Sequence, residues 1–165
     1  MSLLKTFKET LVAKSQLNTT TPPCVVREFV APSGVTHLVV LHDYTIYNCM
    51  GITSNIPGCC YTIPSLELPT HLLVGNREFF KLPLEVQDAY LHHEAAHIAL
   101  GHDTQPPQTI FKRFLGCYDQ QERDADEEAF KHSDMLGALL FLKNSYPYGL
   151  SSRDFQKRIK HLQSL

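Results

Sequence analysis

The strongest structural signal in the chain is residues 83–101, PLEVQDAYLHHEAAHIALG. Between Pro83 and Gly101 there is no further proline or glycine, so nothing in the sequence interrupts a helical backbone. Pro83 suits the first turn of a helix, and Glu85 is favourable near the positive helix end. Gly101 is typical of the residue that follows a helix. We therefore predict a helix over residues 84–101.

The residues before this helix are expected to form a short helix and a small sheet. Residues 3–17 carry apolar side chains at helical spacing with lysines between them, which predicts an amphipathic helix. The next part of the chain changes to short β-rich runs separated by turn residues, which predicts a small, antiparallel sheet. The predicted strands are residues 25–31, 35–41, 44–49, 61–63 and 71–74.

Two more helices are predicted after the first. One long helix is expected over residues 120–142. The sequence Ser151-Ser152-Arg153-Asp154 is typical of a capping box, with Leu150 as its hydrophobic staple, and predicts a last helix that ends near residue 163. Strands followed by helices indicate an α+β fold. The 165 residues suit a single domain, with an N-terminal helix and loop (1–23), a β-rich part (24–76) and a helical part (83–165).

Composition and charge exclude several classes of function. A hydrophobic share of 43% and a charged share of 19% argue against disorder. The net charge of −2, without any run of lysines or arginines, predicts no nucleic-acid partner. The first residues lack the apolar core of a signal peptide, and the longest apolar stretch, residues 135–142, is too short to cross a bilayer. Five cysteines without C-x-x-C spacing favour reduced, mostly buried thiols, so we expect a cytoplasmic protein without membrane insertion.

The predicted helix contains an H-E-x-x-H motif, His93-Glu94-Ala95-Ala96-His97. Residues four apart on a helix lie on one face, so both imidazoles can reach one metal ion. Zinc binds imidazole nitrogen at about 2.0–2.1 Å in tetrahedral sites. Glu94 is expected beside the ion, where its carboxylate can take a proton from a metal-bound water. The motif therefore predicts one zinc ion per chain, with His93 and His97 as ligands and Glu94 as general base.

A third zinc ligand is expected from Glu122, at the start of the second long predicted helix. Asp126 follows four residues later on the same face, where it can accept the second N–H of a ligand histidine and so fix its tautomer. His102, five residues after His97, is the rival third ligand. Five residues is a poor helical spacing, so a supporting role behind the ligands is expected for His102. The competing interpretation of residues 120–131 is a solvated, charged helix start.

These motifs resemble those of gluzincin metallopeptidases, in particular the HtpX-like and CAAX-prenyl-endopeptidase group, and more loosely the ImmA/IrrE proteins and minigluzincins. That group has a further histidine five residues after H-E-x-x-H and a downstream E-x-x-A-D. The matching positions are His93, Glu94, His97, His102, Glu122, Ala125, Asp126 and Ala129. A weaker match is Tyr146-Pro147 followed by Arg158-Ile159 and Leu162. The resemblance covers about residues 70–162 and implies a zincin-like fold with Glu122 as the third zinc ligand.

The function expected from these features is hydrolysis of peptide bonds in a protein or peptide substrate by a zinc-activated water. We expect the substrate to add by main-chain hydrogen bonds to the edge of the strand formed by His71, Leu72, Leu73 and Val74. Tyr118, His132 and Tyr146 are candidate transition-state donors. Two alternatives are a non-catalytic, regulatory zinc-binding interaction protein and a metal-free helical protein with a fortuitous motif. The sequence does not predict the oligomeric state.

Overall fold

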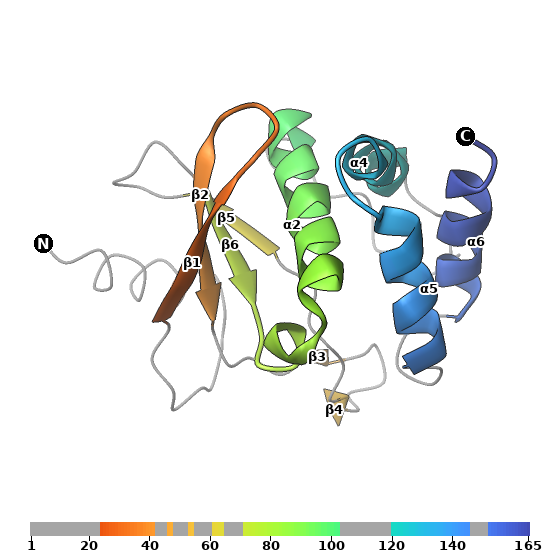
Figure 1. Ribbon diagram of the computed structural model, residues 1–165, viewed down its shortest axis with the longest axis horizontal. Coiled ribbons are helices and arrows are strands. Elements are labelled where there is room, and N and C mark those ends of the chain that lie inside the picture. The colour runs from red at the N-terminus through yellow and green to blue at the C-terminus, as the bar shows by residue number, and fades with distance from the viewer. Residues whose placement is uncertain are drawn as a thin grey trace, which may run out of the picture. The chain divides into compact units, whose positions relative to one another are not determined.

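The architecture is given by a computed structural model that describes residues 24–41, 46–47, 53–54, 61–64, 71–102, 120–145 and 152–165. Contacts along the chain divide it into two compact units, Met1–Leu82 and Pro83–Leu165. The strands belong to the first unit and the long helices to the second, so the predicted α+β class is confirmed (Figure 1). The predicted helix at residues 3–17 lies outside the described residues, and the expectation of a single domain stays a prediction.

The first unit contains a four-stranded sheet in the order β1-β2-β6-β5 (Figure 1). Its strands are β1 (Cys24–Val30), β2 (Thr36–Leu41), β6 (His71–Gly75) and β5 (Tyr61–Pro64). A separate pair is formed by β3 (Ile46–Tyr47) and β4 (Thr53–Ser54), and a short 3-10 helix, η1 (Phe79–Lys81), follows β6. Cys24 is exposed with a free thiol, and the other cysteines lie outside the described residues, so the expectation of mostly buried thiols stays a prediction.

The sheet is mixed, which corrects the predicted antiparallel arrangement. β1 pairs with β2 and β5 pairs with β6 in antiparallel fashion, but β2 and β6 run parallel, with Leu38 opposite Leu72. A parallel pair needs a crossover of a dozen or more residues, and residues 42–70 are long enough to provide one. In β6, Leu72, Leu73, Val74 and Gly75 are all buried, and β2 contributes buried Val39 and Val40 together with buried His37.

The position of β6 also overturns its expected role as a substrate-binding edge. The strand of His71, Leu72, Leu73 and Val74 pairs with β2 on one side and β5 on the other. Its main-chain N–H and C=O groups on both sides therefore face neighbouring strands already, and a peptide cannot add alongside it. The edge strands of this sheet are β1 and β5.

Among the described residues, the second unit contains four helices: α2 (Leu84–Ala99), α4 (Gln120–Phe130), α5 (Met135–Ser145) and α6 (Ser152–Leu162). α2 packs against α4 and α5, and α6 packs against the same two helices. The predicted helix over residues 84–101 is confirmed, and it ends where Gly101 adopts a left-handed φ of 69°. Among the described residues, no helix combines the length and hydrophobicity needed to span a bilayer.

The long helix predicted over residues 120–142 is in fact two helices. Residues 131–134 interrupt it, and α5 begins anew at Met135. At the break, the Ser133 hydroxyl donates to the carbonyl of Ala129 at 2.8 Å, and the Asp134 Oδ1 accepts a hydrogen bond from the Gly137 N–H at 2.8 Å. An aspartate that bonds the N–H three residues on is an N-cap, so Ser133-Asp134 ends one helix and starts the next.

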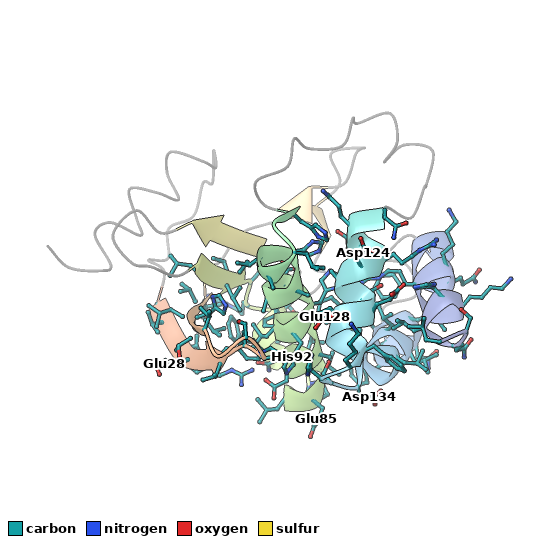
Figure 2. All side chains as sticks on the ribbon, turned by 90° about the horizontal axis from the view of Figure 1, so that it is seen from above. Glu28, Glu85, His92, Asp124, Glu128 and Asp134 are labelled. Atoms are coloured by element: carbon teal, nitrogen blue, oxygen red, sulfur yellow. The ribbon has the colours of Figure 1, made fainter. Side chains whose placement is uncertain are left out.

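Replacing Asp134, which precedes α5 (Figure 2), by alanine is expected to lower the free energy of unfolding by about 1 kcal/mol, because the Gly137 N–H loses its acceptor. Urea denaturation followed by circular dichroism measures this change. Asp134→Asn keeps a side-chain acceptor and serves as the matched control. Equal loss in both variants would show that the cap hydrogen bond is not the cause.

Candidate metal centre

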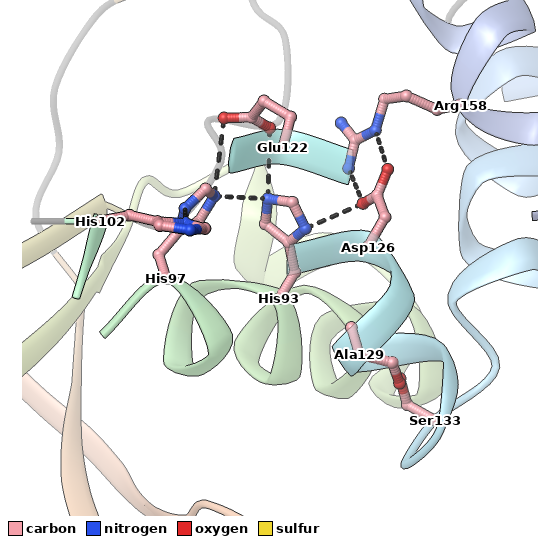
Figure 3. Close-up of polar contacts among 8 residues, drawn as sticks. All are labelled: His93, His97, His102, Glu122, Asp126, Ala129, Ser133 and Arg158. Atoms are coloured by element: carbon pink, nitrogen blue, oxygen red, sulfur yellow. Dashed lines mark hydrogen bonds and ion pairs between the residues drawn. The ribbon is translucent and has the colours of Figure 1, made fainter. Parts of the chain in front are cut away.

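Three side chains of the second unit converge on one point between α2 and α4 (Figure 3). The Nε2 atoms of His93 and His97, which α2 places one turn apart on one face, lie 3.1 Å from each other. Glu122 reaches them from the first turn of α4, with carboxylate oxygens 3.3 Å from His93 Nε2 and 3.5 Å from His97 Nε2. Among the described residues, these three form a donor group that could hold a metal ion.

The spacing of the donors fits a tetrahedral ion. Metal bonds of about 2.0–2.1 Å from imidazole nitrogen place neighbouring donors roughly 3.4 Å apart, because that is the edge of the tetrahedron. The observed separations of 3.1, 3.3 and 3.5 Å lie close to this value. The predicted ligand set of two histidines and Glu122 is therefore brought together by the fold.

The packing of α4 on α2 explains why Glu122 reaches the histidines. Ala125 and Ala129 are fully or almost fully buried, and their small side chains let the two helices approach closely. Glu122 and Asp126 lie on the same face of α4 as these alanines, at helical spacings of three and four residues. The competing interpretation as a solvated, charged helix start does not fit this face, where Ala125, Asp126 and Ala129 are buried, although Gln120 is exposed.

Asp126 holds the ring of His93 from behind. Its Oδ1 lies 2.9 Å from His93 Nδ1, on the opposite side of the imidazole from Glu122 (Figure 3). Asp126 is itself fully buried, and Arg158 of α6 donates to both of its oxygens, at 2.8 Å from Nε to Oδ2 and 2.5 Å from Nη2 to Oδ1. A carboxylate facing Nδ1 favours the tautomer with its proton there, which leaves Nε2 free to bind a metal.

His102 takes the corresponding position behind His97. The two Nδ1 atoms lie 2.9 Å apart, while His97 Nε2 faces Glu122. His102 is not part of the donor group of the described residues, so the expected supporting role fits the geometry better than the rival role as a third ligand. Each histidine of the donor group therefore has a polar group 2.9 Å from its rear nitrogen, and the one at His93 Nδ1 is an ion-pair contact without hydrogen-bond geometry.

Glu94 lies next to His93 in α2 and is 9% exposed. Burial raises the pKa of its carboxyl group to about 8, although the positive charge of His93 opposes the shift. A carboxyl group with a pKa near neutral can both accept and donate a proton under ordinary conditions. Glu94 is not in the donor group, and its role as a base beside the ligands stays a prediction.

The charges of the donor group are coupled. Burial lowers the pKa of His93, but the contacts with Asp126 and Glu122 outweigh burial and raise this pKa to about 9. Burial and the charge of His93 lower the pKa of His97 to about 4. Burial acts to raise the pKa of Glu122, yet its contact with His93 brings that pKa down to about 2. Without a metal, the pair of histidines therefore carries one proton near neutral pH.

We expect one proton to leave the chain for each divalent ion bound, because His93 is protonated below about pH 9 and must lose its proton to coordinate. The apparent affinity should then rise about tenfold between about pH 7 and pH 8. Calorimetric titration with Co²⁺ in buffers of different ionisation enthalpy measures the proton release. An affinity that does not change over this range would contradict the assignment of the proton to His93.

One candidate transition-state donor, His132, lies within the described residues. His132 contacts Glu128 at 3.3 Å, and its ring stacks on that of His92 with centroids 6.1 Å apart. Neither Glu128 nor His92 belongs to the donor group, so the role of His132 as a transition-state donor stays a prediction. Tyr118 and Tyr146 lie outside the described residues.

Arg158 is the residue whose role the sequence analysis missed. In the sequence Arg158 belongs only to a weak motif match, but its position on the apolar face of the last helix indicates that it has a buried partner. Phe155, Ile159 and Leu162 form the buried face of α6, and Arg158 lies on that same face. An arginine among core positions needs a buried acceptor, because burying an unpaired charge is costly.

Neither protein-family models, nor curated proteins, nor solved structures include a match to the chain.

Proposed function

We propose that this chain is a zinc-dependent peptidase in which His93, His97 and Glu122 hold one zinc ion and Glu94 is the general base. The observation that carries the proposal is the His-His-Glu donor group with a buried glutamate beside it on the same helix. Three nitrogen and oxygen donors from protein leave the fourth position of a tetrahedral ion for a water or substrate, which is typical of catalytic zinc sites.

The residues divide the expected chemistry between them. When bound, zinc makes a coordinated water acidic and polarises a carbonyl group. Glu94 accepts a proton from the attacking water and later donates it to the leaving amine. Asp126 and His102 hold the rear nitrogens of His93 and His97, which keeps both Nε2 atoms directed at the ion. A protein or peptide is the proposed substrate.

The first test is zinc content. Elemental analysis of the purified chain is expected to give one zinc per chain, and Glu122→Ala is expected to retain much less after dialysis, because one of three protein ligands is gone. Glu128→Ala is the matched control, since Glu128 lies on the same helix but contacts Lys131 and His132. Unchanged zinc in the Glu122 variant would remove Glu122 from the ligand set and would overturn the proposed site.

A further inference from the structure

We propose that Arg158 is a positioning residue of the metal site: it fixes the carboxylate of Asp126, which in turn fixes the ring of His93. The inference rests on the proposed metal site and extends it to the C-terminal helix α6. It follows from a continuous row of polar contacts between groups that are almost fully buried, in which Asp126 is 0%, His93 3% and Arg158 8% exposed.

The contacts leave the Asp126 carboxylate a single orientation. Arg158 Nε donates to Oδ2 and Nη2 donates to Oδ1, so the planar guanidinium sets the plane of the carboxylate through two bonds. Oδ1 also faces His93 Nδ1 at 2.9 Å. If the carboxylate turned, this oxygen would leave Nδ1, and the imidazole would lose the contact that directs Nε2 toward Glu122 and His97.

An alternative role for Arg158 is simply to attach α6 to α4. The chain provides a comparison for this role, because α6 has a second polar contact with α4, in which His161 Nε2 lies 2.7 Å from Glu127 Oε1. The two contacts use neighbouring residues of α4 and residues one turn apart on α6. Only the Arg158 contact continues to the donor group. Variants of Arg158 and His161 can therefore distinguish an effect on the metal site from an effect on the attachment of α6.

The test compares zinc affinity in the full-length chain and four variants by competition with a chelator. Arg158→Lys keeps the positive charge but loses the bidentate contact with Asp126. His161→Gln is the matched control for the attachment of α6. Asp126→Asn and the double variant that combines Asp126→Asn with Arg158→Lys complete a double-mutant cycle. We expect Arg158→Lys to lose about tenfold in affinity, His161→Gln to lose less than about twofold, and Arg158→Lys to add no loss when Asp126 is already asparagine.

The visible spectrum of the Co²⁺-loaded chain gives a second measurement, because its bands depend on ligand geometry and not on global stability. Arg158→Lys is expected to change these bands, and His161→Gln is not. If Arg158→Lys does not fold, as judged by circular dichroism, Arg158→Gln replaces it in the same cycle. Equal affinity loss in the Arg158 and His161 variants, or parent-like affinity in the Arg158 variant, would overturn the positioning role while leaving the zinc site intact. A folded parent that binds no zinc would overturn the proposed function, and this inference with it.

Discussion

Glu94→Gln is expected to lower the rate of peptide hydrolysis about 10²- to 10⁴-fold while the bound zinc stays in place. Glutamine has almost the same shape as glutamate but cannot accept a proton from the attacking water. Zinc is retained because Glu94 is not one of the three donors. The measurement is mass spectrometry of new amino termini in a peptide library derived from a proteome, together with elemental analysis of both proteins.

Glu85→Gln is the matched control, since Glu85 lies on the same helix but is exposed at its start. It should leave hydrolysis unchanged. Hydrolysis by Glu94→Gln at the parent rate would exclude Glu94 as the base. A zinc-loaded parent that cuts nothing, and binds the same protein partner as Glu94→Gln without processing it, would instead favour the non-catalytic zinc-binding alternative.

Asp126→Ala is expected to lower the free energy of unfolding by about 3–5 kcal/mol, the largest stability change predicted for this chain. The alanine leaves the buried guanidinium of Arg158 without the two hydrogen bonds that it donates to Asp126. Urea unfolding in the presence of a chelator measures the change, because metal binding then makes no contribution to either protein.

The control for Asp126→Ala is a variant that removes both charges, Asp126→Asn with Arg158→Met. Replacing a buried ion pair by uncharged groups of similar size is often neutral, so this variant should recover most of the lost stability. If it is as unstable as Asp126→Ala, the unpaired charge of Arg158 is not the cause of the loss. A loss below about 1 kcal/mol in Asp126→Ala would show that water reaches Arg158 when the carboxylate is absent.

The elements predicted correctly are those whose signals are local. The helix from Leu84 follows from a run without glycine or proline, bounded by Pro83 and Gly101. The parallel pairing of β2 with β6 was not predictable, because it joins strands far apart in the chain and the sequence of neither strand identifies its partner. The break at Ser133-Asp134 was missed because both residues also occur within helices, and only the capping hydrogen bond distinguishes the two cases.

The site shows the same division between local and distant signals. The four-residue spacing of His93 and His97 on one helix was sufficient to predict that both rings face one point. Glu122 and Asp126 were recognised because they share one face of a second helix. Their contact with Arg158 spans 32 residues and depends on how α6 packs against α4, which the sequence pattern does not specify.

The three donors come from two helices, and residues 98–121 connect His97 to Glu122. An ion held by all three would act as a reversible cross-link that closes this loop. Like a disulfide, such a link removes conformations from the unfolded chain as well as adding bonds to the folded one. If the ion is bound as proposed, its removal would then open the helical unit to proteases.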